Sequence, residues 1–295
     1  MITIQSRGVL RLVFGQYWSA LRIVGSLVLW AVSFQAQAGA YTLAVVPQAS
    51  PASTYRQWAP FAERLGDITG QRFQIRVYRT FDEFETDLVN GRVDFAYMNP
   101  YHLLIARQQQ GYLPLLRDDS RRLVGVLVVR RDSLAKSPKD LEGQDIGFPD
   151  PDAFAASLYM RALLLEKEKI KSRARYLTTH SNVYRHVILG SVAAGGGVNQ
   201  TLERERPETR NELRVLYETP GTAPHPLCAH PRIPVVLQQE ITKAVLSMTE
   251  NEEGRTALKH IDMTQPVRAS YVRDYQPLEK LQLEKYRLQK QLPSR

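Results

Sequence analysis

The sequence predicts an α/β fold that is divided into two lobes. Its 295 residues exceed the size of a typical single domain. From residue 41 to about residue 110, apolar strand patterns alternate with amphipathic helix patterns, and short connections join them. This alternation is typical of a parallel sheet covered by helices. The hydrophobic content of 43% and the charged content of 23% exclude a wholly disordered chain.

Three strands and three helices are predicted in the first part of the chain. The strands cover residues 41–47, 73–78 and 93–98, and the helices cover 54–65, 81–88 and the segment that begins at 100. Ser53 and Asn99 are the expected N-caps, because their side chains accept hydrogen bonds from backbone N–H groups of the first turn. Pro100 suits the first helical position, and Gly70 ends the first of these helices.

The rest of the chain repeats the pattern. Strands are predicted over residues 123–129, 145–148, 192–197 and 213–217, and helices over 153–169, 181–189 and from 235 to a charged amphipathic stretch at 278–292. We interpret the strand at 123–129 and the segment 213–230 as crossings between two lobes. The predicted first lobe comprises residues 41–127 plus 226–295, and the second comprises 128–225. A ligand is expected between the lobes, at the carboxyl ends of the strands.

The first 40 residues have the features of a secretory signal peptide. They contain Arg7, Arg11 and Arg22 and no acidic residue, and an apolar run at 23–32 is followed by Ala36-Gln37-Ala38. We predict a signal peptide over residues 1–38, with cleavage after Ala38 or, alternatively, after Ala40. The other interpretation is a membrane anchor, but the apolar run is shorter than the ~20 residues that span a bilayer.

Charge and cysteine content exclude several classes of protein. The formal net charge is +9, and loss of the three arginines of the signal peptide reduces it to +6. This excess is scattered, and no basic run with interleaved aromatic residues is present, so we expect no nucleic-acid partner. The single cysteine excludes an intrachain disulfide and a cysteine-based zinc cluster. His225, Cys228 and His230 lack a fourth metal ligand, so no metal and no cofactor are predicted.

Four strand-to-helix junctions are suited to binding an oxyanion. They lie at residues 48–54, 99–101, 152–157 and 179–182, where small or polar residues begin a helix. Free backbone N–H groups and the positive end of the helix dipole favour a bound anion at such places. The alternative is that Ser53, Asn99 and Ser181 are ordinary helix caps.

Individual side chains near these junctions also have two interpretations. His180 either donates to an anion or is structural, and Tyr97 and Tyr101 either line a cleft or pack in the core. The three glycines at 195–197 permit close approach of the backbone to a ligand, or positive φ angles. Asp150 and Asp152 beside Pro151 are expected to be partners of the turn and of the helix dipole rather than catalytic carboxylates.

Several segments together resemble a known family. They are Trp58-Ala59-Pro60-Phe61 with Gly70 downstream, the run 91–100 (Gly-Arg-Val-Asp-Phe-Ala-Tyr-Met-Asn-Pro), the run 148–157 (Phe-Pro-Asp-Pro-Asp-Ala-Phe-Ala-Ala-Ser), Thr179-His180-Ser181, and the run 190–197 (Gly-Ser-Val-Ala-Ala-Gly-Gly-Gly). In this order they resemble the periplasmic phosphate/phosphite/phosphonate-binding proteins, the PhnD-like family. The resemblance covers roughly residues 41–235.

The resemblance implies a type II periplasmic-binding-protein fold, in which two α/β lobes close over a small oxyanion. It implies a non-enzymatic solute receptor in the periplasm that delivers its ligand to an ABC permease. Carried over by position, it places residues 97–101 in the contact loop of the first lobe, residues 153–157 at the phosphonate, and His180 at the anion. With the junction residues, the predicted ligand-binding set is Ser53, Tyr97, Asn99, Tyr101, Ala155, Ala156, Ser157, His180 and Ser181.

One segment departs from the family pattern. Phosphonate binders of this family usually have a Ser-Thr-Ser run where this chain has Ala153-Phe154-Ala155. Three hydroxyl donors are therefore expected to be missing. Since a hydrogen bond to a charged ligand contributes ~1.5–3 kcal/mol, their loss would weaken phosphonate binding by orders of magnitude.

Two alternative functions remain open. The first is a sensory protein that presents its ligand state to a membrane histidine kinase, which the altered anion loop and the charged C-terminal stretch suggest. The second is an enzyme on a related two-lobed fold, in which His180 or Cys228 would be the candidates for catalysis.

Overall fold

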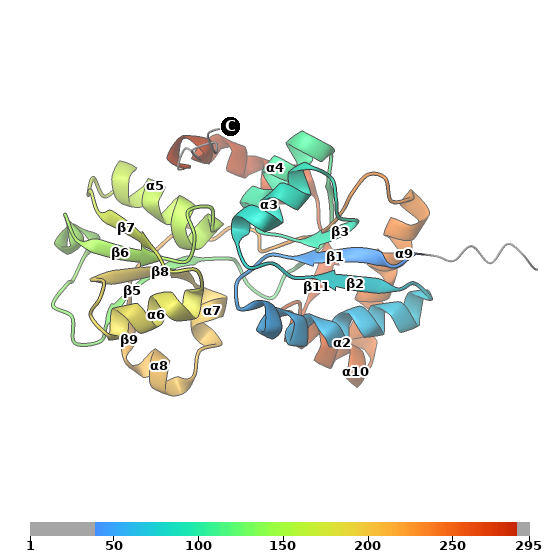
Figure 1. Ribbon diagram of the computed structural model, residues 1–295, viewed down its shortest axis with the longest axis horizontal. Coiled ribbons are helices and arrows are strands. Elements are labelled where there is room, and N and C mark those ends of the chain that lie inside the picture. Colours follow the sequence, from blue (N-terminus) through green and yellow to red (C-terminus); the bar gives the residue numbers. More distant parts are fainter. Residues whose placement is uncertain (1–38, 288–295) are drawn as a thin grey trace, which may run out of the picture. The chain divides into compact units, whose positions relative to one another are not determined.

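The computed structural model describes residues 39–287, which form strands, helices and short connections (Figure 1). The predicted signal peptide at residues 1–38 lies outside this range. Within the described range, no helix combines the length and the apolar character that crossing a membrane requires.

The first sheet has six strands in the order β11-β4-β10-β3-β1-β2. The strands are β1 (Tyr41–Val45), β2 (Phe73–Arg76), β3 (Phe95–Tyr97), β4 (Leu113–Asp118), β10 (Leu227–Ala229) and β11 (Pro266–Arg268). β1 is parallel to β2 and β3, whereas β10 is antiparallel to β3 and β4, and β11 is antiparallel to β4. The sheet is therefore mixed, and the prediction of a parallel sheet holds only for β1, β2 and β3.

The second sheet has five strands in the order β7-β6-β8-β5-β9. They are β5 (Gly125–Arg130), β6 (Asp145–Phe148), β7 (Arg173–Tyr176), β8 (Ala194–Val198) and β9 (Leu213–Glu218). β6 is parallel to β7 and β8, and β5 is antiparallel to β8 and β9. The strand partners that the structure gives to β5 all lie in this sheet, so the strand predicted at 123–129 is not shared between the two sheets.

Two short segments connect the sheets. One joins β4 to β5 and the other joins β9 to β10, and they pair with each other through an antiparallel bridge between Leu123 and Thr222. The Leu123 N–H donates to the Thr222 carbonyl at 3.0 Å, and the Thr222 N–H donates to the Leu123 carbonyl at 2.9 Å. These two connecting segments thus lie side by side, and the lobe boundaries at 127 and 226 stay a prediction.

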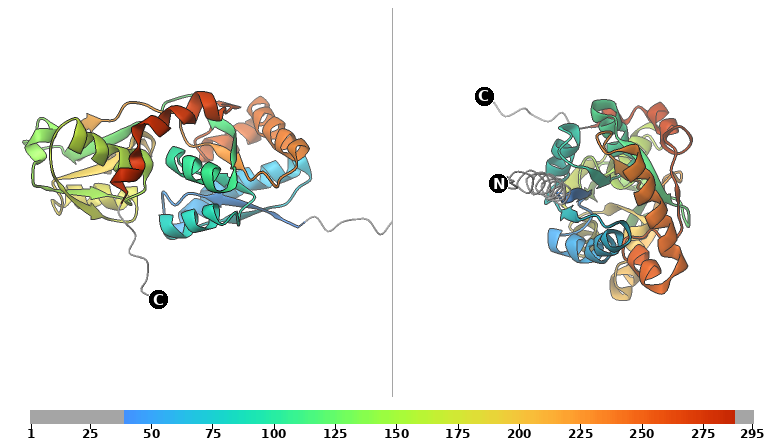
Figure 2. Two further views of the ribbon diagram at one scale, coloured as in Figure 1. Left: turned by 90° about the horizontal axis from the view of Figure 1, so that it is seen from above. Right: turned by 90° about the vertical axis from the view of Figure 1, so that its right-hand side faces the viewer.

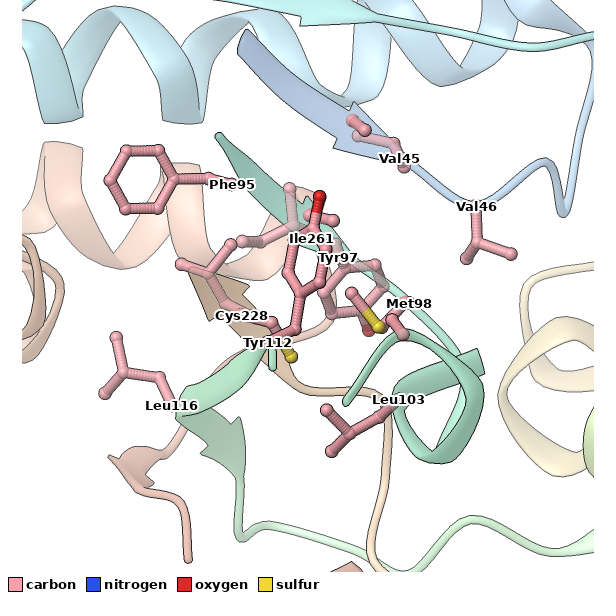
Figure 3. Close-up of a cluster of buried hydrophobic side chains, with 14 of the residues drawn as sticks. Val45, Val46, Phe95, Tyr97, Met98, Leu103, Tyr112, Leu116, Cys228 and Ile261 are labelled. Carbon is pink, nitrogen blue, oxygen red and sulfur yellow. The ribbon is translucent and has the colours of Figure 1, made fainter. Parts of the chain in front are cut away.

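The helices cover the sheets. The part of the molecule built on the first sheet, called the first half below, contains α2 (Pro51–Thr69), α3 (Phe81–Val89), α4 (Pro100–Gln110), α9 (Val235–Ser247) and α10 (Glu252–His260). The part built on the second sheet, called the second half, contains α5 (Tyr159–Glu166), α6 (His180–Ile188), α7 (Asn199–Glu203) and α8 (Pro207–Asn211). A five-residue π-helical turn, Phe154–Leu158, leads into α5. Most of the buried apolar side chains form one continuous core, which includes Val45, Tyr97 and Cys228 from three strands of the first sheet (Figure 3).

The helix starts confirm one predicted cap and correct two. Asn99 caps α4, since its Oδ1 accepts from the His102 N–H at 2.8 Å. α2 begins earlier than predicted, with Ser50 and not Ser53 as its N-cap, because Pro51 takes the first helical position and fixes φ there. α6 is capped by Thr179 and not by Ser181, through a hydrogen bond from the Asn182 N–H at 3.2 Å.

The C-terminal segment differs from the predicted charged amphipathic helix. In the described part, two short 3₁₀ turns, Gln276–Leu281 and Leu283–Tyr286, are separated by Gln282 in the left-handed conformation, with φ of 48°. This segment runs from the first half to the second (Figure 2), where the Tyr286 hydroxyl donates to Glu166 of α5 at 2.8 Å. Residues 288–292 of the predicted helix lie outside the described range.

Candidate functional site

Two adjoining cavities lie where the two halves meet. The inner cavity has a volume of about 10 Å³, and the outer groove has a volume of about 950 Å³. Val46, Gln48 and His180 line both of them, so the two spaces share a wall. Because a water molecule needs roughly 10–15 Å³ of such volume, the inner cavity has room for about one water.

Both halves contribute to the inner cavity. It is lined by Val46, Gln48, Phe81, Asn99 and His225 from the first half and by Ala153, Phe154, Ala155, Ala156, His180 and Val198 from the second. Among these described residues there is no carboxylate and no Lys or Arg, so neutral dipoles dominate the electrostatics of the cavity.

The start of the π-helical turn faces this cavity. Its internal hydrogen bonds begin at Ser157, whose N–H donates to the Ala153 carbonyl at 2.9 Å. The N–H groups of residues 154–156 precede this bond and point toward the helix N-terminus, where an anion is stabilised. The Ala153 side chain makes no capping hydrogen bond, so the backbone supplies the donors here.

Glycines allow this turn to lie directly against the second sheet. A Cβ at Gly125 of β5 would be 2.1 Å from the Ala155 carbonyl oxygen, and one at Gly196 of β8 would be 2.1 Å from that of Ala156. The glycine run at 195–197 therefore lets β8 approach the π-helical turn and α6 closely. The run does not form a turn with positive φ angles. All three of its residues belong to β8.

Two buried histidines line the cavity as neutral rings. The His180 Nδ1 lies 3.1 Å from the Thr201 Oγ1, and the His225 Nε2 lies 3.3 Å from the Gln48 Nε2. Burial, assisted by the nearby Arg204 charge, lowers the pKa of each histidine to about 3. Since an amide nitrogen only donates, His225 accepts from Gln48 at Nε2 and carries its proton on Nδ1. Both rings act toward a ligand through hydrogen bonds and not through positive charge.

This protonation state predicts a specific pH dependence. A histidine whose pKa is near 6.5 when unfolded and near 3 when folded stabilises the fold above pH 6.5, and this stability is lost as pH falls toward 3. We expect the free energy of unfolding to drop by about 2 kcal/mol per buried histidine between pH 7 and pH 5. In NMR titrations of the imidazole groups, the signals of His180 and His225 should stay constant from pH 5 to 8, and a midpoint near 6.5 for either would contradict the assignment.

The structure separates the other predicted site residues. The Tyr97 ring stacks on His225 with a centroid distance of 5.5 Å and borders the outer groove. Asn99 lies on the inner cavity, but its Nδ2 donates to the Asp152 carbonyl at 3.3 Å, so its amide joins the two halves. Ser53 and Ser181 border only the outer groove.

Two predicted residues lie outside both cavities. Tyr101 faces the C-terminal segment, with the Arg287 guanidinium 5.9 Å from its ring centroid. Ser157 is buried under the turn, where its hydroxyl lies 3.4 Å from Arg161 Nε. Sequence reasoning placed Gln48 in a predicted junction without singling it out and considered His225 only as a metal ligand, although their positions just after β1 and just before β10 were the available signal.

The described residues contain no arrangement suited to a metal ion. Among them, no group of three or more His, Cys, Asp or Glu side chains is arranged to hold a metal ion. Cys228 is fully buried on β10, and burial raises the pKa of its thiol, which removes thiolate character. Asp150 accepts from the Asp152 N–H at 2.9 Å, as expected for a turn.

The chain is similar to known periplasmic binding proteins in both sequence and fold. Residues 43–275 match the family model of periplasmic substrate-binding proteins of ABC phosphonate transporters. No curated protein matches the sequence. Among solved structures, the chain is similar to the binding protein component of an ABC phosphonate transporter from Pseudomonas aeruginosa, with a TM-score of 0.75 and 15% identity over 83% of this chain and 86% of that chain.

Two further structures share the fold. PhnD1 from Prochlorococcus marinus in complex with methylphosphonate has a TM-score of 0.75 and 14% identity over 84% of this chain and 99% of that chain. XAC2383 from Xanthomonas citri bound to ATP has a TM-score of 0.68 and 17% identity over 84% of this chain and 98% of that chain. These similarities confirm the predicted type II periplasmic-binding fold with two lobes.

The family match confirms the resemblance that the sequence motifs indicated. It extends beyond the segment that carried those motifs and takes in strands of both sheets. The chain therefore belongs to the periplasmic substrate-binding proteins of ABC phosphonate transporters.

Proposed function

We propose that the inner cavity holds the phosphorus oxyanion group of the substrate. The observation that carries this proposal is the convergence of donors from both halves on one cavity without a carboxylate. The backbone N–H groups of residues 154–156 approach it from one side, and the Gln48 amide approaches it from the other. Helix N-termini and neutral donors stabilise an anion without a formal positive charge.

Entry of the substrate requires the two halves to move apart. The inner cavity has room for about one water molecule, which is too little for a tetrahedral phosphonate group. The paired connections at Leu123 and Thr222 supply a hinge of two adjacent chain segments. We infer that the halves open about these connections and close over the anion, and that the closed form docks on the ABC permease.

Calorimetry on the full chain tests the proposal. We expect binding heat with methylphosphonate, phosphite or phosphate, and none with choline, which has no anionic group. Gln48→Ala should weaken the affinity by about tenfold or more, since it removes one hydrogen bond to a charged ligand. Gln74→Ala, at an exposed position of β2, is the matched control and should leave the affinity unchanged. Absence of heat with every phosphorus oxyanion would reject the proposal.

The proposal also covers export of the chain and its partner at the membrane, which is either an ABC permease or a sensor histidine kinase. We propose that residues 1–38 direct the chain to the periplasm, which agrees with the family to which it belongs. The kinase alternative depended partly on a long charged C-terminal helix. Since residues 276–287 form short turns instead, that support is weaker, and delivery to an ABC permease is the function we favour.

A further inference from the structure

We propose that the outer groove is a second anion-binding site, so that the preferred substrate carries at least one phosphate group beyond the one in the inner cavity. The inference rests on the proposed function, because the inner cavity anchors the first anionic group. It goes further in assigning the substrate to phosphorus compounds with a chain of charged groups, such as polyphosphates.

The first argument is volume and adjacency. The outer groove is about 950 Å³, against about 10 Å³ for the inner cavity. Gln48 and His180 border both spaces, so the groove lies directly beside the place of the first anionic group and is within reach of a longer ligand. Cavities of about 300–1,000 Å³ are typical of complete small-molecule sites, whereas a small phosphonate would leave this one almost empty.

The second argument is charge. Basic side chains outnumber acidic ones on the groove: the basic ones are Arg56, Arg121, Arg204, Arg206 and Lys259, and the acidic ones are Glu205 and Asp262. They come from both halves, since α2 carries Arg56, α10 carries Lys259, and Arg204 and Arg206 lie in the connection between α7 and α8. A concave surface with one predominant sign of charge concentrates ligands of the opposite sign.

The third argument is that some basic side chains of the groove form salt bridges and others do not. Arg204 pairs with Asp262 at 2.9 Å, and Arg121 pairs with Glu203 and Asp262, so these cations are already neutralised. Arg56, Arg206 and Lys259 form no salt bridge within 4.0 Å to any residue of the described range. A second phosphate group in the groove would be an anionic partner for these exposed cations, which have none among the described residues.

Binding measurements on the full chain test this site with defined probes in metal-free buffer. We expect tripolyphosphate to bind at least tenfold more tightly than methylphosphonate. The double variant Arg206→Ala/Lys259→Ala should weaken tripolyphosphate binding by about tenfold, which corresponds to about threefold for each exposed charge. Its affinity for methylphosphonate should change less than twofold, because that ligand occupies only the inner cavity.

A matched control separates the groove from the overall charge. Arg79→Ala/Lys243→Ala removes the same charge from exposed positions outside both cavities and should leave the affinity for tripolyphosphate within twofold. Equal losses in both double variants, or equal affinities of the two ligands, would overturn the second site while methylphosphonate binding upholds the proposed function. Absence of binding by every probe would overturn both.

Discussion

Phe154→Thr is expected to raise the affinity for methylphosphonate by more than tenfold. The Phe154 side chain is 2% exposed and borders the inner cavity, where the first turn of the helix begins. Threonine would enlarge the cavity and place a hydroxyl donor beside the free N–H groups. One hydrogen bond to a charged ligand contributes ~1.5–3 kcal/mol, which is about ten- to a hundredfold in affinity.

The same substitution should lower the stability of the fold. The Phe154 ring stacks on Tyr159 at a centroid distance of 5.9 Å and belongs to the main core. Truncation of a buried phenylalanine costs about 3–5 kcal/mol. For the same variant, urea unfolding should therefore show a lower free energy of unfolding, and calorimetry should show tighter binding of methylphosphonate.

A second phenylalanine provides the control. Phe84 of α3 is fully buried and packs on Tyr78 and His102, and it does not border either cavity. Phe84→Thr should lower the stability by a comparable amount and leave the affinity for methylphosphonate unchanged. If both variants change the affinity equally, Phe154 does not obstruct the anion site.

The sequence predicted the features that depend on neighbouring residues in the chain, such as the start of a helix. Asn99-Pro100 is a correct helix start because the cap and the first helical position are adjacent in the chain. The three-residue strand β10 was not predicted, since its pairing with β3 and β4 connects segments more than a hundred residues apart. Its antiparallel direction, which makes the first sheet mixed, was inaccessible for the same reason.

The candidate site was predicted in part. The turn at Ala155 and Ala156 and the ring of His180 lie on one cavity, as the positions of their helix starts suggested. Tyr101 does not, because a residue two positions after Asn99 is turned about 200° around the helix axis. Gln48 and His225 converge only through the folding of two distant segments, 177 residues apart, so no local pattern identifies them as a pair.

Arg287 is the clearest case of a contact that local sequence does not reveal. Its guanidinium binds Glu85 of α3 at 2.7 and 3.0 Å and Asp152, at the entry to the π-helical turn, at 2.9 and 3.1 Å. These partners precede it by 202 and 135 residues. Burial opposes the charge of Arg287, but the two carboxylates outweigh it and raise the pKa of the guanidinium. The residue thereby links the two halves through the C-terminal segment.

Arg287→Ala is expected to lower the free energy of unfolding by about 3 kcal/mol. The Glu85 and Asp152 side chains are 10% and 8% exposed, so the variant leaves two carboxylates in a poorly hydrated place without the guanidinium. Removing one partner of a buried ion pair costs about 3–5 kcal/mol. Urea unfolding at pH 7 measures the loss, and Arg130→Ala, which breaks an exposed pair with Asp132, should cost less than about 1 kcal/mol.

Neutralising the carboxylates should reverse most of this loss. If unpaired charge causes the instability, then Glu85→Gln/Asp152→Asn in the Arg287→Ala background should recover stability relative to Arg287→Ala alone, because no buried anion remains. A purely steric role for the arginine side chain predicts no recovery. Since Asp152 lies at the entry to the turn whose N–H groups we propose to bind the anion, Arg287→Ala should also weaken methylphosphonate binding, whereas Arg130→Ala should not. Equal stability of the Arg287→Ala and Arg130→Ala variants would show that the ion cluster does not hold the two halves together.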